Sequence, residues 1–152
     1  MTKKLLLLST GGTIASVVSD EGLAPGESGE ELIKMLGRLE YDITVRDILE
    51  LDSSNIQPEE WKIIAEAIYD HRNEYDGIVV SHGTDTMAYT ASMLTFMLQH
   101  INIPVVLTGS QVPMNVILSD APDNLRLAFA AAANCEPGVY IAFNRNAWLS
   151  EC

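Results

Sequence analysis

The chain has 152 residues, the length of one ordinary domain, and its 47% apolar and 20% charged residues are typical of a globular protein. Its net charge of −12 repels phosphodiester backbones and anionic membrane surfaces, so we expect no nucleic acid and no membrane as partner. The four leucines at residues 5–8 are too few to span a bilayer, and a Gly-Gly-Thr turn follows them instead of a cleavage site. These features predict a cytoplasmic protein.

Apolar runs of strand length alternate along the chain with segments of helical periodicity. Strands are predicted at 4–9, 43–48, 77–81, 104–108 and 138–143. Helices are predicted at 29–36, at 61–68 behind Pro58, at 87–98, and at 125–132 behind Pro122. Several strands are apolar without alternation, as in a sheet that is covered on both faces. This order predicts an α/β fold with a doubly wound, mostly parallel sheet flanked by helices, of the Rossmann-like or flavodoxin-like type.

Polar clusters follow four of the predicted strands. They are Thr10-Gly11-Gly12-Thr13, Leu51-Asp52-Ser53-Ser54, His82-Gly83-Thr84-Asp85 and Thr108-Gly109-Ser110-Gln111. Ligands of open parallel sheets bind beyond the carboxyl ends of the strands, where these clusters lie. Taken singly, the glycines could form a turn, and Ser53, Ser54, Thr84 and Asp85 could cap helices. Because capping does not require hydroxyls at all four loop tips, we expect Thr13, Ser53, Thr84 and Asp85 to surround one pocket.

Thr13 is the candidate nucleophile of this pocket. A threonine hydroxyl attacks once a base removes its proton, and a carboxylate can hold that base in position. The two glycines before Thr13 leave room for a substrate and for backbone amides that stabilise an oxyanion. We therefore predict amide hydrolysis, in which Thr84 and Asp85 relay or orient a proton and Ser53 holds a substrate carboxylate. A nucleotide site has little support, since neither G-x-G-x-x-G nor G-K-[ST] occurs.

The histidines and cysteines suggest no further chemistry. Cys135 and Cys152 are too few for a disulfide framework, and no second cysteine or histidine lies near either of them at metal-ligand spacing. We therefore expect no metal site. His82, at the end of a strand, is more readily explained as a packed or solvated side chain than as a base.

The segments STGGTIAS and VVSHGTDTMAYTASML, with LDSS between them, resemble the bacterial-type L-asparaginase family. The resemblance runs from about residue 4 to about Phe143 and includes VVLTGSQVP and SDAPDNL. It implies hydrolysis of asparagine, sometimes of glutamine, to the acid and ammonia without metal or organic cofactor. It also implies a homo-oligomer, a dimer or a tetramer, in which residues 1–152 correspond to the N-terminal α/β domain of a longer chain.

The resemblance also implies roles for individual residues. Thr13 matches the nucleophilic threonine of the first motif, and Thr84 and Asp85 match the threonine and aspartate of the second. The aspartate also contacts the α-amino group of the substrate, whereas Ser53 and the backbone amide of Gly83 match groups that hold the α-carboxylate. The expected substrate-binding residues are Asp52, Ser53, Ser54, Gly83, Thr84 and Asp85.

Three departures from the family pattern stand out. Leu23 occupies the position where many members carry a tyrosine that assists the threonine. The family lysine that activates the threonine matching Thr84 has no counterpart, because lysines occur only at 3, 4, 34 and 62. Family members are roughly twice as long, and their C-terminal domain, which completes the site, is expected to be absent from this chain.

Two functional hypotheses therefore remain open. The first is an L-asparaginase-type amidohydrolase, of which the 152-residue polypeptide alone is expected to release ammonia poorly or not at all. The second is a catalytically inert α/β module that binds a small amino acid or nothing. A third, an asparaginase-like protein that supplies ammonia for amidation of a charged tRNA, is disfavoured by the acidic charge.

The helix predicted at 87–98 bears on assembly. It carries Met87, Met93, Phe96 and Met97, which is more apolar surface than one small domain needs to expose. We therefore expect the chain to associate with copies of itself.

Overall fold

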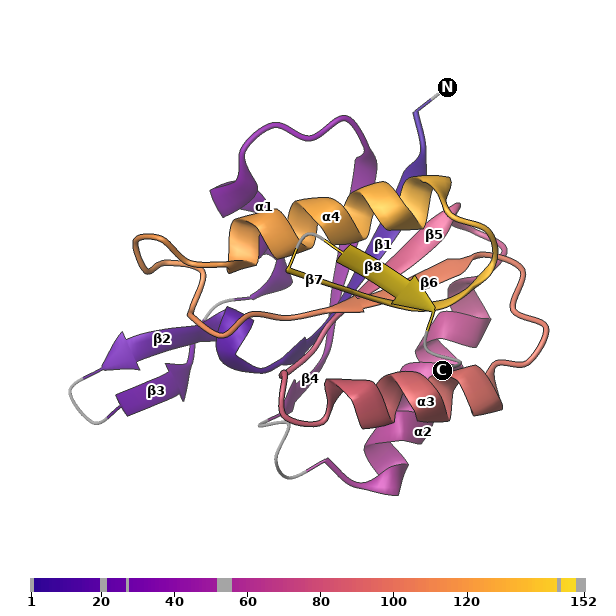
Figure 1. Ribbon diagram of the computed structural model, residues 1–152, viewed down its shortest axis with the longest axis horizontal. Coiled ribbons are helices and arrows are strands. Elements are labelled where there is room, and N and C mark those ends of the chain that lie inside the picture. Colours follow the sequence, from indigo (N-terminus) through magenta and orange to yellow (C-terminus); the bar gives the residue numbers. More distant parts are fainter. Residues whose placement is uncertain (1, 20–21, 27, 52–55, 145, 150–152) are drawn as a thin grey trace.

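A six-stranded, mostly parallel sheet forms the centre of the computed structural model, which describes residues 2–19, 22–26, 28–51, 56–144 and 146–149 (Figure 1). The strand order is β4-β1-β5-β6-β7-β8. The first five strands of this order are parallel, and only β8 runs antiparallel to its neighbour β7. The strands are β1 (Lys4–Gly11), β4 (Asp42–Leu51), β5 (Gly77–Ser81), β6 (Pro104–Thr108), β7 (Gly138–Phe143) and β8 (Asn146–Leu149).

Helices cover both faces of this sheet, so the predicted doubly wound α/β fold is confirmed. They are α1 (Gly29–Leu36), α2 (Pro58–His71), α3 (Met87–Met97) and α4 (Ala121–Asn134). The helices α1 and α4 lie on one face, and α2 and α3 lie on the other (Figure 1). Among the residues that the structure describes, no helix combines the length and the apolar character needed to cross a bilayer.

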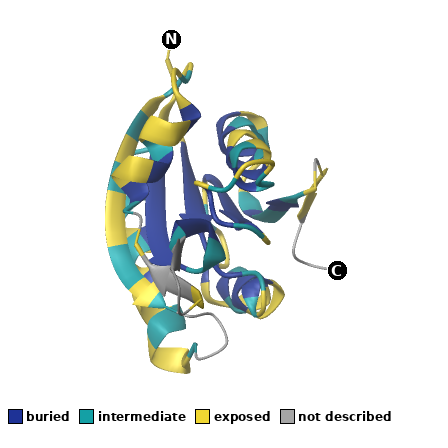
Figure 2. Cartoon of the chain, turned by 90° about the vertical axis from the view of Figure 1, so that its left-hand side faces the viewer, coloured by how far each residue is buried: buried dark blue, intermediate teal, exposed yellow. Residues whose placement is uncertain are grey.

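The leucine run of β1 is the middle of the core. All four side chains are fully buried, and they divide between the two faces of the sheet. Leu5 and Leu7 pack in the cluster formed with α1 and α4, while Leu6 and Leu8 pack in the cluster formed with α2 and α3. Successive side chains of a strand point to opposite faces, so a strand with helices on both sides is apolar throughout. Figure 2 shows these buried strands between the helical layers.

Three strands of the structure were not predicted. After the short 3-10 helix η1 (Thr13–Ala15), β2 (Ser16–Ser19) and β3 (Gly22–Pro25) form an antiparallel hairpin that projects from the sheet (Figure 1). Leu23, at the family's tyrosine position, pairs with Val18 in this hairpin. The third is the edge strand β8. Each of these strands has four residues, too few for a periodic pattern to identify.

The apolar surface predicted on α3 is only partly present. Met87 is wrongly assigned to that surface, because it is 6% exposed and packs in the core beside α2 and the sheet. Phe96 and Met97 are 74% and 40% exposed, and Tyr89 on the same helix is also exposed. Self-association through this surface stays a prediction.

Candidate active site

The loop after β1 lies directly against the loop after β5. A Cβ atom added to Gly12 would lie 2.6 Å from the nitrogen of Gly83 and 2.7 Å from its Cα. Gly12 also has φ 86° and ψ −178°, a conformation that essentially only glycine adopts. Two residues earlier, the hydroxyl of Thr10 donates to the carbonyl of Ser81 at 2.7 Å. The contact therefore places the loop of Thr13 beside the loop of Thr84, at the same end of the sheet.

The loop after β6 packs against the same place. A Cβ atom on Gly109 would lie 3.4 Å from the methyl group of Thr84 and would collide with the carbonyl of His82. Side chains from the start of α4 hold this loop. The carboxylate of Asp120 accepts from the backbone nitrogen of Gln111 at 2.9 Å, and Asn124 Nδ2 donates to the carbonyl of Gly109 at 2.9 Å.

The end of β4 adjoins the first loop. The backbone nitrogen of Gly12 donates to the carbonyl of Leu51 at 2.9 Å, and a Cβ atom on Gly11 would lie 2.7 Å from the nitrogen of Leu51. The expected ligands Asp52, Ser53 and Ser54 lie outside the described residues. Their roles as ligands stay predictions. The alternative that Ser53 or Ser54 is the N-cap residue of α2 is wrong, because that position is held by Gln57.

The candidate catalytic side chains form no hydrogen bonds within the described part of the chain. Thr13 and Thr84 are half-buried and Asp85 is exposed, and within the described part of the chain none of the three makes a side-chain hydrogen bond. Helix α3 begins at Met87, and its N-cap residue, Thr86, makes no side-chain capping bond. The structure thus gives no support to capping as the reason for Thr84 and Asp85.

His82 belongs to a hydrogen-bond network that the sequence did not reveal. Its side chain is 1% exposed, with Nδ1 2.7 Å from the carbonyl oxygen of Gly83 and Nε2 2.9 Å from Thr90 Oγ1. Trp61 Nε1 donates to the same Thr90 oxygen at 2.8 Å. Burial lowers the pKa of His82, and its hydrogen bond to Gly83 partly opposes that effect. Nothing in the sequence pattern connects Trp61 and Thr90, because they lie on separate helices.

The lowered pKa of His82 predicts acid sensitivity of the fold. In the unfolded chain histidine takes up a proton near pH 6.5, whereas in the folded chain it does so only at lower pH. The folded state therefore loses stability as the pH falls from about 7 through 6.5. The loss stops below the folded-state pKa, since both states then bind the proton.

Chemical denaturation of the wild-type chain and of His82→Asn between pH 5 and pH 8 measures this loss. The difference in unfolding free energy should vary with pH by up to about 1.4 kcal/mol per pH unit, the limit for one proton. His71 and His100 are present in both proteins, so their contributions to the difference in unfolding free energy cancel. A difference that does not vary with pH would show that His82 titrates alike in both states.

The described residues offer no metal site, and Lys3 and Lys4 lie at the other end of the sheet from the candidate active site. Within these ranges, no group of three or more histidine, cysteine, aspartate or glutamate side chains could hold a metal ion. Lys3 and Lys4 lie at the start of β1, the opposite end of the sheet from the four loops, and Lys62 on α2 lies 3.9 Å from Glu66. Lys3 and Lys4 are therefore not placed to act as the family's catalytic lysine does.

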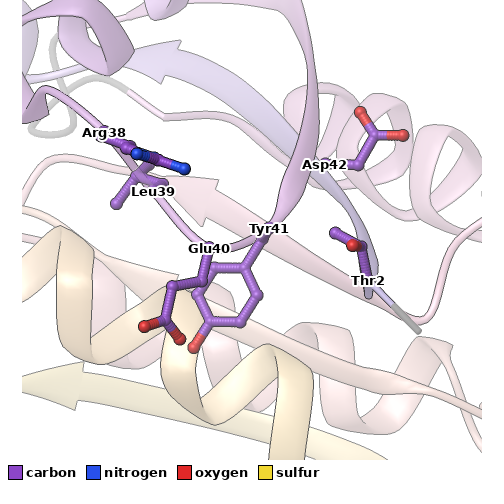
Figure 3. A pocket seen from close by; sticks show the side chains of 6 residues that line it. All are labelled: Thr2, Arg38, Leu39, Glu40, Tyr41 and Asp42. Atoms are coloured by element: carbon purple, nitrogen blue, oxygen red, sulfur yellow. The ribbon is translucent and has the colours of Figure 1, made fainter.

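A pocket in the described residues lies at that opposite end. It is lined by residues that precede β1 or lead into β4, namely Thr2, Arg38, Leu39, Glu40, Tyr41 and Asp42 (Figure 3). Ligands of a parallel sheet bind at the carboxyl ends of its strands, so this pocket is not the candidate active site.

Comparison with known proteins identifies the family. The family described as "Asparaginase, N-terminal" matches residues 4–150, beyond Phe143, where the resemblance was expected to end. The L-asparaginase of Thermococcus kodakarensis is 50% identical over 143 residues, which are 92% of this chain and 44% of that protein. A glutamyl-tRNA(Gln) amidotransferase component from Thermoplasma acidophilum is 41% identical over 144 residues, which are 90% of this chain and 35% of that one.

Solved structures give the same result. The thermostable L-asparaginase from Thermococcus kodakarensis superposes with a TM-score of 0.90 at 48% identity, covering 97% of this chain and 46% of that one. A probable cytoplasmic L-asparaginase from Campylobacter jejuni superposes with a TM-score of 0.83 at 34% identity, covering 98% of this chain and 46% of that one. The chain thus spans about half the length of the L-asparaginases that it matches. It belongs to the asparaginase family and corresponds to the N-terminal domain of its members.

Proposed function

We propose that this chain carries the threonine nucleophile of an L-asparaginase-type amidohydrolase, which hydrolyses L-asparagine to L-aspartate and ammonia. The observation that carries the proposal is the backbone contact between Gly12 and Gly83. Through it, the loop of Thr13 lies beside the loop of Thr84 and Asp85, and the family resemblance assigns catalysis to these three residues. Their side chains form no hydrogen bonds in the described ranges, which leaves them available to a substrate.

In the proposed reaction, Thr13 Oγ attacks the side-chain amide carbon of asparagine. A carbon–oxygen bond forms, the carbon–nitrogen bond breaks, and the hydroxyl proton passes by way of Thr84 to the departing ammonia. Water then hydrolyses the aspartyl ester on Thr13. Asp85 binds the α-amino group, and Ser53 with the Gly83 amide binds the α-carboxylate, next to Asp52 and Ser54.

The active form, in this proposal, is a cytoplasmic homo-oligomer of a longer chain. The exposed Phe96 and Met97 on α3 support self-association, because contact with another copy would remove them from water. The location is extended from the Campylobacter jejuni relative, which is described as a probable cytoplasmic enzyme.

The 41% sequence identity to a glutamyl-tRNA(Gln) amidotransferase component favours a second candidate function. In this second candidate, the protein supplies ammonia to a partner enzyme. The net charge of −12 argues against direct contact of this chain with tRNA. The two candidates differ in whether free asparagine is hydrolysed without a partner protein.

Ammonia release from asparagine tests the proposed function. The samples are the 152-residue chain, the C-terminal half of Thermococcus kodakarensis L-asparaginase, and a fusion of residues 1–143 with that half. We expect little or no release by either part alone and steady turnover by the fusion, since the family resemblance places the missing lysine beyond the fifth strand, in the part that the fusion supplies. A folded fusion that releases no ammonia would favour the inert module, and full activity of the 152-residue chain alone would show that the lysine is dispensable.

A further inference from the structure

The hydrogen bonds around His82 have only one consistent direction. The carbonyl oxygen of Gly83 can only accept, so the proton of the imidazole lies on Nδ1. Neutral imidazole carries one proton, so Nε2 accepts, and the hydroxyl of Thr90 donates to it. The indole nitrogen of Trp61 can only donate, and its acceptor is the same Thr90 oxygen. Each proton in the series therefore points from Trp61 through Thr90 and His82 to Gly83.

The network ends on a peptide that the proposed function needs. The carbonyl of Gly83 and the nitrogen of Thr84 belong to one planar peptide, so a bond that fixes the oxygen also fixes the start of Thr84. On its other side, the nitrogen and Cα of Gly83 lie against Gly12. The backbone nitrogen of His82 is fixed too, by donation to the carbonyl of Thr108 at 2.8 Å. Gly83 is thus held between the His82 side chain and the loop that carries Thr13.

His82 is unsuited to act on a substrate itself. Its side chain is 1% exposed, and both ring nitrogens are engaged within the protein. A buried polar ring with two satisfied partners restricts the conformation of the groups that it bonds.

We propose that Trp61, Thr90 and His82 form a directed hydrogen-bond relay that fixes the Gly83–Thr84 peptide, next to the Gly83 nitrogen and Cα that lie against Gly12, and that His82 is a positioning residue for Thr84 and Asp85. The effect of this relay on catalysis rests on the proposed function. The hydrogen bonds of the relay are independent of that function. Helices α2 and α3, which supply Trp61 and Thr90, thereby determine how the second motif faces the first.

The tautomer of His82 can be read by 15N NMR of the histidine-labelled 152-residue chain. We expect the proton on Nδ1 for His82, identified by the loss of its signals in His82→Asn. Exposed neutral histidines in water favour the other tautomer, so His100 in the same spectrum serves as an internal reference. A proton on Nε2 of His82 would overturn the relay, because the carbonyl of Gly83 would then have no donor from the ring.

The variant Thr90→Val tests the connection to Thr84. It removes the hydroxyl between Trp61 and His82 while keeping the side-chain shape. Thr95→Val is the matched control, because Thr95 lies on the same helix and its hydroxyl donates to the carbonyl of Ala91. We expect Thr90→Val to shift the amide signals of Gly83 and Thr84, because the bond that fixes the carbonyl of Gly83 is weakened. Thr95→Val should leave those signals in place.

A second pair of variants separates positioning from packing. The amide of His82→Asn can still donate toward Gly83, and we expect it to keep the Thr84 amide signal closer to the wild type than His82→Leu does.

Kinetics of the fusion protein test the same connection. In that protein, Thr90→Val should lower kcat for asparagine about tenfold, because a small misplacement of catalytic groups is costly. Thr95→Val should change kcat less than about twofold, since its hydroxyl lies outside the relay. If the fusion protein hydrolyses no asparagine, the proposed function fails, and the NMR results on the 152-residue chain still decide the relay. Unchanged Gly83 and Thr84 signals in Thr90→Val would contradict the relay.

Discussion

Replacing Thr13 by alanine is expected to abolish ammonia release by the fusion protein while leaving aspartate binding nearly intact. The substitution removes the hydroxyl proposed to attack the amide but none of the groups proposed to hold the α-amino and α-carboxylate groups. Loss of a nucleophile from a catalytic unit lowers kcat by several orders of magnitude, so we expect a fall of at least about 10³-fold. Steady-state ammonia release and calorimetric titration with aspartate measure the two effects.

Asp85→Ala provides the contrast. Its carboxylate is proposed to bind the α-amino group and to orient the proton transfer, so both turnover and aspartate binding should fall. Because Asp85 is exposed and makes no side-chain hydrogen bond in the described ranges, its loss should leave the fold intact. If Thr13→Ala retains most of the activity, the glycine-glycine-threonine motif is structural and the proposed nucleophile is wrong.

Gly12→Ala is expected to destabilise the chain and to separate the two loops. Alanine is strained at φ 86° and ψ −178°, and its Cβ would lie 2.6 Å from the nitrogen of Gly83, where backbone cannot move aside cheaply. Backbone strain of about 1 to 3 kcal/mol and overpacking of similar size together predict a loss of about 3 kcal/mol or more in unfolding free energy.

Gly37→Ala is the matched control for that loss. Gly37 has φ 77° and ψ −145°, close to the conformation of Gly12, but a Cβ atom there meets nothing within 4 Å. It should therefore cost the backbone strain alone, about 1 to 3 kcal/mol. Urea denaturation of both variants gives the comparison. If the two variants lose the same amount of unfolding free energy, the backbone of Gly83 moves away from the new Cβ at no energetic cost.

The buried strands could be predicted because their sequence reflects burial on both faces. The strands Gly77–Ser81, Pro104–Thr108 and Gly138–Phe143 have the bounds that the sequence predicts. Parallel strands that alternate with helices also bring their carboxyl ends to one edge, so the meeting of the Gly12 and Gly83 loops followed from topology. The antiparallel pair β2 and β3 and the edge strand β8 did not, since short strands are defined by the partners they pair with and not by a periodic pattern.

Prediction of the site was limited in a similar way. Motif order placed Thr13, Thr84 and Asp85 in loops that the structure brings to one end of the sheet. The support behind them was missed, because Trp61 and Thr90 are 29 residues apart on separate helices and only the tertiary structure joins them. Met87 was misplaced because a nearly uniformly apolar helix does not show in its sequence which side faces the core.

The formation of an aspartyl ester on Thr13 tests the central claim most directly. The fusion protein would be mixed with asparagine, quenched with acid within milliseconds, digested and mapped by mass spectrometry. The proposed mechanism predicts an aspartyl group on the peptide that contains Thr13, absent from Thr13→Ala and present before ammonia release reaches its steady rate. An aspartyl group on the peptide that contains Thr84, or steady turnover with no ester on Thr13, would contradict it.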